Sequence, residues 1–245
     1  MNVGPPALPP SNHIDTAKMY GNEKSVGDAV RESGLKREDV FITSKISSGH
    51  GHSYQNALAT VDESLRNFGF DYVDLYLIHD PRSGKESRLE AYRGLLEAKK
   101  QGKVRSVGVS NFSVKHLEEL KESGLEQPEV NQIELHPFCQ QKPIVDYCRK
   151  YGIVIQAYCP LIRGKFDEPI LQNVAKKHSK DVAQVLVRWS LQKGYIPLPK
   201  SSQPARIKSN ADAYNFVLSD EDMEAIDSLD IGDSGAVSWN PVNVS

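Results

Sequence analysis

The chain has 245 residues, which is enough to bury a substantial core within one domain. Charged residues make up 25% and hydrophobic residues 39%, the ordinary balance of a globular protein. The formal net charge of −2 argues against nucleic acid or a membrane surface as a partner, and no apolar run is long enough to span a membrane.

The cysteines and histidines give no sign of a disulfide framework or a metal site. Cys139, Cys148 and Cys159 are odd in number and widely spaced, so we expect free thiols in a reducing, cytoplasmic compartment. The N-terminus lacks the charged start and apolar centre of a secretion signal. His50 and His52 have no third ligand nearby in the sequence, so we expect a solvated glycine-rich loop there and no metal.

Short apolar runs alternate with amphipathic segments from residue 13 onward. Residues 1–12 contain four prolines and no periodic pattern, so we expect an irregular leader and then one domain over residues 13–245. The apolar runs predict strands at residues 13–16, 40–44, 72–78, 104–109, 129–135, 153–158 and 196–199. Helical spacing predicts helices at residues 22–33, 53–68, 87–101, 113–123, 143–151, 168–178, 181–193, 204–211 and 220–228.

The regular alternation of strand and helix predicts a parallel sheet. No Gly-x-Gly-x-x-Gly pattern follows a strand, which disfavours a doubly wound dinucleotide-binding fold. A (β/α)8 barrel of the TIM type fits better, although the pattern contains seven strands where such a barrel has eight.

Reactive side chains follow or end nearly every predicted strand. On a parallel barrel these positions converge at one mouth, where active sites are found. In chain order they are Asp15 with Tyr20, Lys45, His79, Ser110 with Asn111, Gln132, Tyr158, and Lys200 with Ser201. We therefore expect the chemistry of this protein at that mouth.

Four of these side chains suit the reduction of a carbonyl group. Hydride addition to the carbonyl carbon places negative charge on oxygen, so a donor must stabilise that charge and deliver a proton. A free tyrosine, with a pKa of about 10, is a poor acid near neutrality, but a neighbouring ammonium lowers its pKa. Lys45 can supply that ammonium to Tyr20. Asp15 can hold Lys45 in place, and His79 can donate a second hydrogen bond to the carbonyl oxygen.

The segment Ile-Asp-Thr-Ala-x-x-Tyr-Gly-Asn-Glu, residues 14–23, resembles the active-site signature of the aldo-keto reductases. Thr-Ser-Lys at residues 43–45 and Asp-Leu-Tyr-Leu-Ile-His at residues 74–79 also stand in the contexts expected for that family. The resemblance extends from residue 13 to about residue 230. It implies a catalytic tetrad made of Asp15, Tyr20, Lys45 and His79.

The second half of the chain resembles the NADP(H)-binding segments of the same family. Residues 107–112 and 131–137 are similar to segments that hold the nicotinamide carboxamide, and residues 157–161 to one whose tyrosine stacks on the nicotinamide ring. Residues 196–201 and the helix start after them are similar to the adenosine site, where a cationic cluster suits the 2′-phosphate. The implied NADP(H) contacts are Ser110, Asn111, Gln132, Tyr158, Pro160, Leu161, Lys200, Ser201, Arg206 and Asn210. Cys159 replaces the usual serine.

In the family, a first strand and helix precede the Ile-Asp-Thr-Ala strand. A strand–crossover–strand unit needs about 30 residues, and twelve residues precede His13. We therefore expect an N-terminally shortened member with an incomplete barrel. Family members are expected to be monomers, but exposed strand edges would allow self-association.

The main hypothesis is an NADPH-dependent reductase of small-molecule aldehydes or ketones, with Tyr20 as the proton donor. The alternative is an NADPH-binding barrel of impaired catalysis, regulatory or degenerate, because of the missing first unit. A barrel hydrolase or isomerase is disfavoured, because metal-ligand clusters and a phosphate-loop glycine pattern are absent from the sequence. The short segment 161–167 and the short tail with Trp239 predict an open substrate pocket.

Overall fold

The computed structural model describes residues 12–244, which form two compact units. The N-unit contains residues 12–133, 143–154 and 240–244, and the C-unit contains residues 134–142 and 155–239. The predicted leader lies outside the described residues except for Asn12. The expectation of one domain over residues 13–245 stays a prediction.

Seven strands occur within residues 12–244, in the sheet order β1 to β7. The pairs β1–β2, β2–β3, β3–β4, β4–β5 and β6–β7 are parallel. This alternation and order confirm the predicted fold class, a (β/α)8 barrel that is incomplete. The strands are β1 (His13–Asp15), β2 (Phe41–Ile46), β3 (Val73–Ile78), β4 (Val104–Ser110), β5 (Val130–Glu134), β6 (Val154–Tyr158) and β7 (Ile196–Pro197). The strand bounds differ from the prediction by one or two residues, most at the C-terminal ends of β2 and β7. β2 continues through Lys45, and β7 is short because Pro197 and Pro199 lack the N–H that a ladder needs.

All nine predicted helices are present among the described residues. They are α1 (Glu23–Glu32), α2 (Tyr54–Phe68), α3 (Lys85–Lys100), α4 (Val114–Glu122), α5 (Lys142–Tyr151), α6 (Pro169–His178), α7 (Val182–Gln192), α8 (Pro204–Ala211) and α9 (Asp220–Asp227). Two serines cap helices, since Ser53 accepts a hydrogen bond from Asn56 N at the start of α2 and Ser219 accepts one from Asp222 N at the start of α9. Over the same residues, no helix is both long and apolar enough to cross a bilayer.

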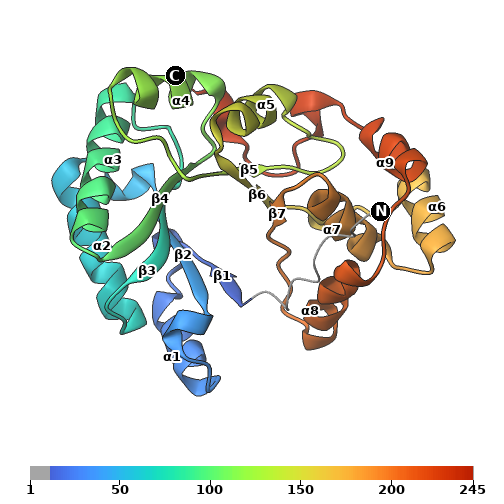
Figure 1. Cartoon of the computed structure of the whole chain (residues 1–245), viewed down its shortest axis with the longest axis horizontal. Coiled ribbons are helices and arrows are strands. Elements are labelled where there is room, and N and C mark those ends of the chain that lie inside the picture. The colour runs from blue at the N-terminus through green and yellow to red at the C-terminus, as the bar shows by residue number, and fades with distance from the viewer. Residues whose placement is uncertain (1–11, 245) are drawn as a thin grey trace, which may run out of the picture. The chain divides into compact units, whose positions relative to one another are not determined.

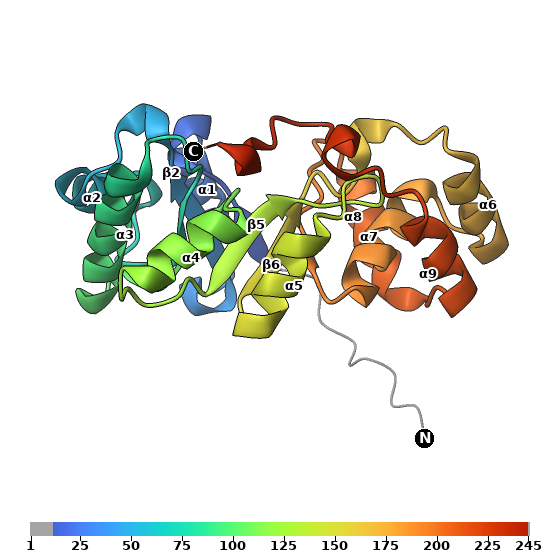
Figure 2. The ribbon, with the colours of Figure 1, turned by 90° about the horizontal axis from the view of Figure 1, so that it is seen from above.

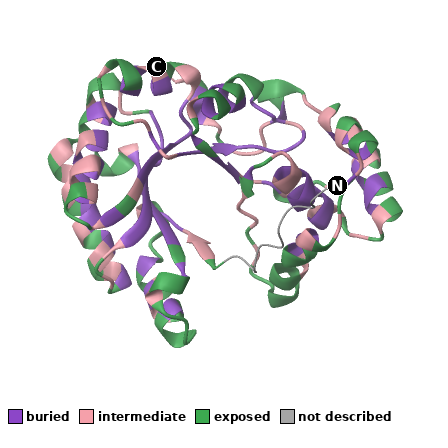
Figure 3. Ribbon diagram, viewed as in Figure 1, coloured by how far each residue is buried: buried purple, intermediate pink, exposed green. Residues whose placement is uncertain are grey.

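In the N-unit, α2 and α3 lie side by side against the strands (Figures 1 and 2). All six residues of β3 are buried, which explains its continuous apolar run (Figure 3). Two glycines let the helices approach closely. A Cβ on Gly27 would lie 2.0 Å from the carbonyl oxygen of Phe68, and one on Gly94 would lie 2.6 Å from that of Tyr54.

In the C-unit, β6 and β7 pair through Gln156 with Ile196 and Ala157 with Pro197. The helix α6 packs against α7 and α9, and Trp189 of α7 is fully buried. The indole N–H of Trp189 donates a 2.8 Å hydrogen bond to the carboxylate of Asp227, so α7 and α9 are joined by a polar contact as well as by packing.

Candidate active site

Lys45 and Asp15 form a close ion pair at the ends of β1 and β2. The ammonium nitrogen of Lys45 lies 2.6 Å from Oδ1 of Asp15 and donates a second hydrogen bond, of 2.9 Å, to the carbonyl oxygen of Thr16. The side chain of Lys45 is 0% exposed, whereas that of Asp15 is 17% exposed. The parallel register places Asp15 opposite Thr43, two residues before Lys45, so neighbouring strands bring the two charges together.

Burial governs the electrostatics of this pair. Loss of hydration lowers the pKa of Lys45, and the charge and hydrogen bond of Asp15 oppose that shift. Asp15 therefore helps a buried ammonium to keep its proton. Because Lys45 belongs to β2, the hydrogen bonds of the sheet hold its backbone in place. Its side chain extends to Asp15 and Thr16 at the end of the neighbouring strand β1.

Tyr20 and His79 lie beside the Lys45 ammonium. Tyr20 belongs to the short 3-10 turn η1 (Lys18–Tyr20), and the centre of its ring is 5.4 Å from Nζ of Lys45. Its ring meets that of His79 edge to face, with 5.8 Å between centroids. Tyr20 is 53% exposed, so the phenol stands between the buried charge and solvent.

The imidazole of His79 is neutral at physiological pH. Burial and the neighbouring Lys45 ammonium lower its pKa to about 3. His79 follows β3 directly, and its backbone N–H donates a 2.8 Å hydrogen bond to Ile46 O at the end of β2. A neutral imidazole carries one N–H, which can donate a hydrogen bond without adding charge to the site.

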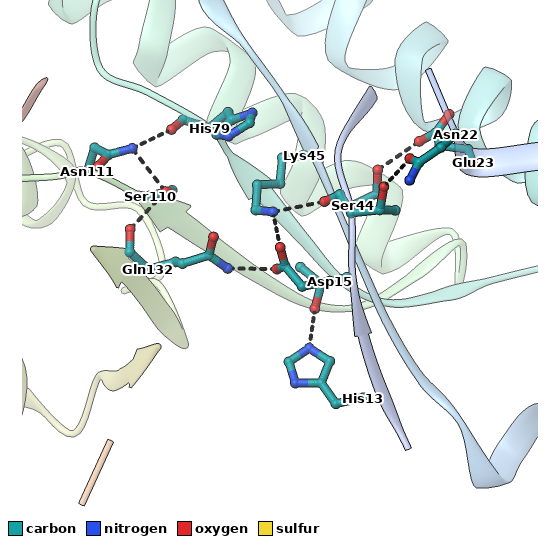
Figure 4. A network of polar contacts seen from close by, with 12 residues as sticks. His13, Asp15, Asn22, Glu23, Ser44, Lys45, His79, Ser110, Asn111 and Gln132 are labelled. Atoms are coloured by element: carbon teal, nitrogen blue, oxygen red, sulfur yellow. Dashed lines mark hydrogen bonds and ion pairs between the residues drawn. The ribbon is translucent and has the colours of Figure 1, made fainter. Parts of the chain in front are cut away.

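Ser110, Asn111 and Gln132 form a connected group next to these residues (Figure 4). Ser110 Oγ donates to the carbonyl oxygen of Gln132 at 2.8 Å, and the Asn111 amide donates to Ser110 Oγ at 3.1 Å and to His79 O at 3.0 Å. The Gln132 amide donates to Oδ2 of Asp15 at 2.8 Å. One hydrogen-bonded network therefore joins Asp15, Lys45 and the backbone carbonyl of His79 to three of the residues predicted for NADP(H).

The structure adds two neighbours that the sequence interpretation gave no role. Glu23 is buried and accepts hydrogen bonds from Ser44 Oγ at 2.7 Å and from the Asn67 amide at 2.9 Å. His13 contacts the hydroxyl of Thr43 at 2.9 Å, behind the Asp15 pair. Glu23 is the last residue of the signature segment in the sequence. Its hydrogen bond with Asn67 joins residues that are 44 apart in the chain, so the sequence pattern alone did not indicate this contact.

The remaining predicted contacts belong to the C-unit. Tyr158 ends β6 and is half-buried, and Cys159 follows it with a positive φ of 52°. Pro160 is buried and Leu161 is half-buried. The structure thus places this group on the loop after a parallel strand, as the sequence predicted.

The predicted adenosine group surrounds the start of α8. Lys200 and Arg206 are exposed cations, and Ser201 Oγ accepts a 3.1 Å hydrogen bond from the backbone N–H of Gln203. Asn210 is buried in the last turn of the same helix. Lys200, Ser201 and Arg206 therefore form a local group within the C-unit. Their role in binding NADP(H) stays a prediction.

No cluster of three or more metal-ligating side chains occurs among the residues that the structure describes. Over that same part of the chain, Cys139, Cys148 and Cys159 are free thiols.

Residues 11–231 match the family model of the Aldo/keto reductase family. Because this is most of the chain, the protein belongs to the aldo/keto reductase family, and the predicted resemblance is confirmed.

Relatives and solved structures agree with that membership. A glyoxal reductase from Bacillus subtilis is 47% identical over 217 residues, which cover 88% of this chain and 78% of that protein. The crystal structure of MGS-M4, an aldo-keto reductase from a deep-sea metagenome library, matches with a TM-score of 0.87 and 40% identity, covering 90% of this chain and 82% of that one. A Bombyx mori aldo-keto reductase in complex with NADP matches with a TM-score of 0.83 and 36% identity, covering 89% and 78%.

Proposed function

We propose that this protein is an NADP-dependent oxidoreductase that reduces aldehydes or ketones to alcohols, with Tyr20 as the proton donor. The observation that carries the proposal is the buried Lys45–Asp15 pair beside the half-exposed ring of Tyr20. A fixed ammonium next to a phenol favours the phenolate, which makes the phenol a better acid. Family membership and a relative named for glyoxal reduction support the same reaction class.

The N-unit fits the carboxamide end of a nicotinamide cofactor. A carboxamide offers one carbonyl acceptor and two N–H donors, and Ser110, Asn111 and Gln132 supply hydroxyl and amide groups of both kinds within one hydrogen-bonded group. Structural neighbours were solved with NADP or NADPH, which supports this cofactor. When bound, NADPH would supply the hydride.

The protein groups then handle the oxygen of the substrate. Tyr20 and His79 donate hydrogen bonds to the carbonyl oxygen, so that negative charge developing there is stabilised. Tyr20 transfers its proton to that oxygen as the carbon accepts the hydride, which yields the alcohol. Lys45 stabilises the phenolate that remains, and solvent returns a proton to it afterwards.

Asp15 acts on the reaction through Lys45 and does not contact the substrate itself. Its carboxylate keeps the buried Lys45 protonated and fixes the direction of the ammonium, while its second oxygen accepts the hydrogen bond from Gln132. In the reverse direction the same residues would oxidise an alcohol, with the Tyr20 phenolate as base. The free thiols of the described residues also agree with a reducing compartment, for which we propose the cytoplasm.

Replacing Tyr20 by Phe tests the proposal. Tyr20→Phe keeps the ring beside His79 but removes the proton, so turnover of a generic aldehyde should fall at least about 1,000-fold. NADPH affinity, measured by fluorescence titration, should stay within about twofold. Tyr151→Phe, at the end of α5, is the matched control and should keep the parent rate. Parent-level turnover in Tyr20→Phe would refute the mechanism, and NADPH binding without turnover in the parent would favour the alternative, an NADPH-binding barrel protein.

A further inference from the structure

The turn that carries Tyr20 is short. η1 is a single 3-10 turn, with hydrogen bonds from Tyr20 N to Ala17 O at 2.9 Å and from Gly21 N to Lys18 O at 3.2 Å. An isolated turn of this length has little intrinsic stability. Met19 and Tyr20 are 52% and 53% exposed, so burial of these side chains contributes little to holding the turn.

Lys18, the first residue of the turn, is anchored to two helices. Its side chain is 13% exposed, and its ammonium forms an ion pair with Glu63 of α2 and lies 3.9 Å from the carboxylate of Glu23 of α1. The hydrogen bond from Lys18 lowers the pKa of Glu63. Lys18 is therefore a cation held between two acidic groups from two different helices.

One of those acidic groups is itself rigidly held. Glu23 is 2% exposed, and one of its oxygens accepts a hydrogen bond from Ser44 of β2 (Figure 4). Its other oxygen accepts one from Asn67 of α2. Ser44 precedes Lys45, so the Glu23 carboxylate is fixed to the strand that carries the catalytic ammonium. A buried carboxylate also favours a nearby cation, because its charge has lost hydration.

A separate hydrogen bond joins the two ends of the loop between β1 and α1. The hydroxyl of Thr16 donates a 2.5 Å hydrogen bond to the side-chain carbonyl of Asn22, which joins the residue after β1 to the residue before α1. This contact fixes where the loop begins and ends. Beyond this base, the ring of Tyr20 contacts Lys45 and His79, and Lys18 anchors the same turn to α1 and α2.

We propose that Lys18 is a positioning residue, whose ammonium, held by Glu63 and Glu23, keeps the Tyr20 ring against Lys45 and His79. The inference rests on the proposed function, since it assumes that the Tyr20 phenol donates the proton. It extends that function by assigning a role to a charge that does not touch the reacting atoms. A phenol displaced from Lys45 loses both its alignment and the ammonium that makes it acidic.

Two substitutions test Lys18 from opposite sides of the ion pair. Lys18→Met removes the ammonium while keeping a long apolar side chain, and Glu63→Ala removes the exposed partner on α2. Each should lower kcat about tenfold with little change in KM for the aldehyde, because alignment in the transition state is lost and ground-state binding is kept. The basic limb of the kcat/KM profile should move to higher pH, since the phenol has lost its neighbouring ammonium. Lys18→Arg should retain most of the parent kcat.

A measurement without cofactor or substrate checks the same idea. Amide hydrogen exchange over residues 17–23 should accelerate about tenfold in Lys18→Met and Glu63→Ala, and stay at the parent rate in Lys24→Met. Lys24 is the matched control, since it forms an exposed ion pair with Asp28 on α1. If Lys18→Met does not fold, Glu63→Ala and Lys18→Arg carry the test.

The outcomes separate the two proposals. Parent-level kcat and exchange in both Lys18→Met and Glu63→Ala, with Tyr20→Phe inactive, would overturn the role of Lys18 and leave the proposed function standing. Parent-level turnover in Tyr20→Phe would instead remove the proposed function. Equal losses in Lys24→Met would show a general effect of charge, which also contradicts a specific role for Lys18.

Discussion

The amide of Gln132 donates a 2.8 Å hydrogen bond to the carboxylate of Asp15, which is 117 residues earlier in the chain. The same carboxylate holds Lys45 through its other oxygen. Gln132, which is predicted to bind the cofactor, is therefore hydrogen-bonded to Asp15, which is predicted to hold the ammonium that lowers the pKa of the Tyr20 phenol. Cofactor binding and proton transfer should accordingly be coupled through Asp15.

Replacing Gln132 by Leu tests that coupling. The substitution removes the amide at nearly constant volume, so NADPH should bind about tenfold more weakly, a change of about 1.4 kcal/mol. The kcat should also fall severalfold, because Asp15 loses a partner that orients it. Fluorescence titration and steady-state kinetics measure the two effects. Gln101→Leu, at the exposed end of α3, is the control, and a Gln132→Leu protein with parent values of both would contradict the coupling.

Replacing Asp15 by Asn should damage activity and stability together. Burial already lowers the pKa of Lys45, and loss of the opposing carboxylate should lower it further, so that less ammonium is present near neutrality. We expect kcat to fall about 100-fold and the free energy of unfolding to fall by about 3 kcal/mol, because a buried cation loses its counter-ion.

Urea denaturation and turnover of an aldehyde measure these two losses. Lys45→Met provides a comparison, since it removes the buried charge itself and should be as inactive as Asp15→Asn but less destabilised. An active Asp15→Asn protein would show that Lys45 keeps its charge without help.

Most of the fold follows from short-range patterns in the sequence. Strands buried on both faces produce continuous apolar runs, and β3 is the clearest case, with every residue buried. Glycine marks helix ends in a sequence, and Gly69 and Gly102 adopt the positive φ that ends α2 and follows α3. Asp74, which interrupts the apolar run of β3, is explained by hydrogen bonds from Arg37 at 2.6 Å and from Ile42 N at 2.9 Å.

The site was harder to predict wherever it depends on contacts between distant side chains. The signature located Asp15, Tyr20, Lys45 and His79, because residues at strand ends converge in any parallel barrel. The role of Lys18 could not be predicted, since Lys18 lies in a loop between predicted elements and Glu63 in a helical pattern, and the two meet only where the turn lies against α2. The orientation of side chains at such contacts is set by tertiary packing, which local periodicity does not encode.

The depressed pKa of His79 predicts a loss of stability in acid. Its pKa in the folded protein is about 3, below its ordinary value of 6.5, because burial and Lys45 disfavour the imidazolium. Between these values the unfolded chain binds the additional proton, so the free energy of unfolding should fall as pH is lowered through 6.5 toward 3. The slope from this residue is at most about 1.4 kcal/mol per pH unit.

Urea denaturation at pH 7, 6, 5 and 4 measures this effect in the parent and in His79→Gln. The substituted protein should show a shallower pH dependence, because the residue that takes up the proton on unfolding is gone. His13, His52 and His116, whose pKa values are also lowered by burial, contribute equally to both proteins. Parallel stability curves for the two proteins would contradict the assignment.

The buried ion pair between α3 and α4 provides a test of the N-unit that is independent of catalysis. Arg88 is buried and donates two hydrogen bonds to Oε2 of Glu119, at 2.6 and 2.9 Å, and a third of 2.9 Å to Pro81 O. Arg88→Met leaves the Glu119 carboxylate without that cation in a buried position, so the free energy of unfolding should fall by about 3–5 kcal/mol. Arg93→Met, on the same helix, removes an exposed pair with Glu90 and should cost less than about 1 kcal/mol.

The double variant Arg88→Met, Glu119→Leu should recover part of the loss, since no buried charge is left behind. Urea denaturation of the three variants decides the matter, and similar stabilities for Arg88→Met and Arg93→Met would show that Glu119 finds hydration or another partner when Arg88 is removed.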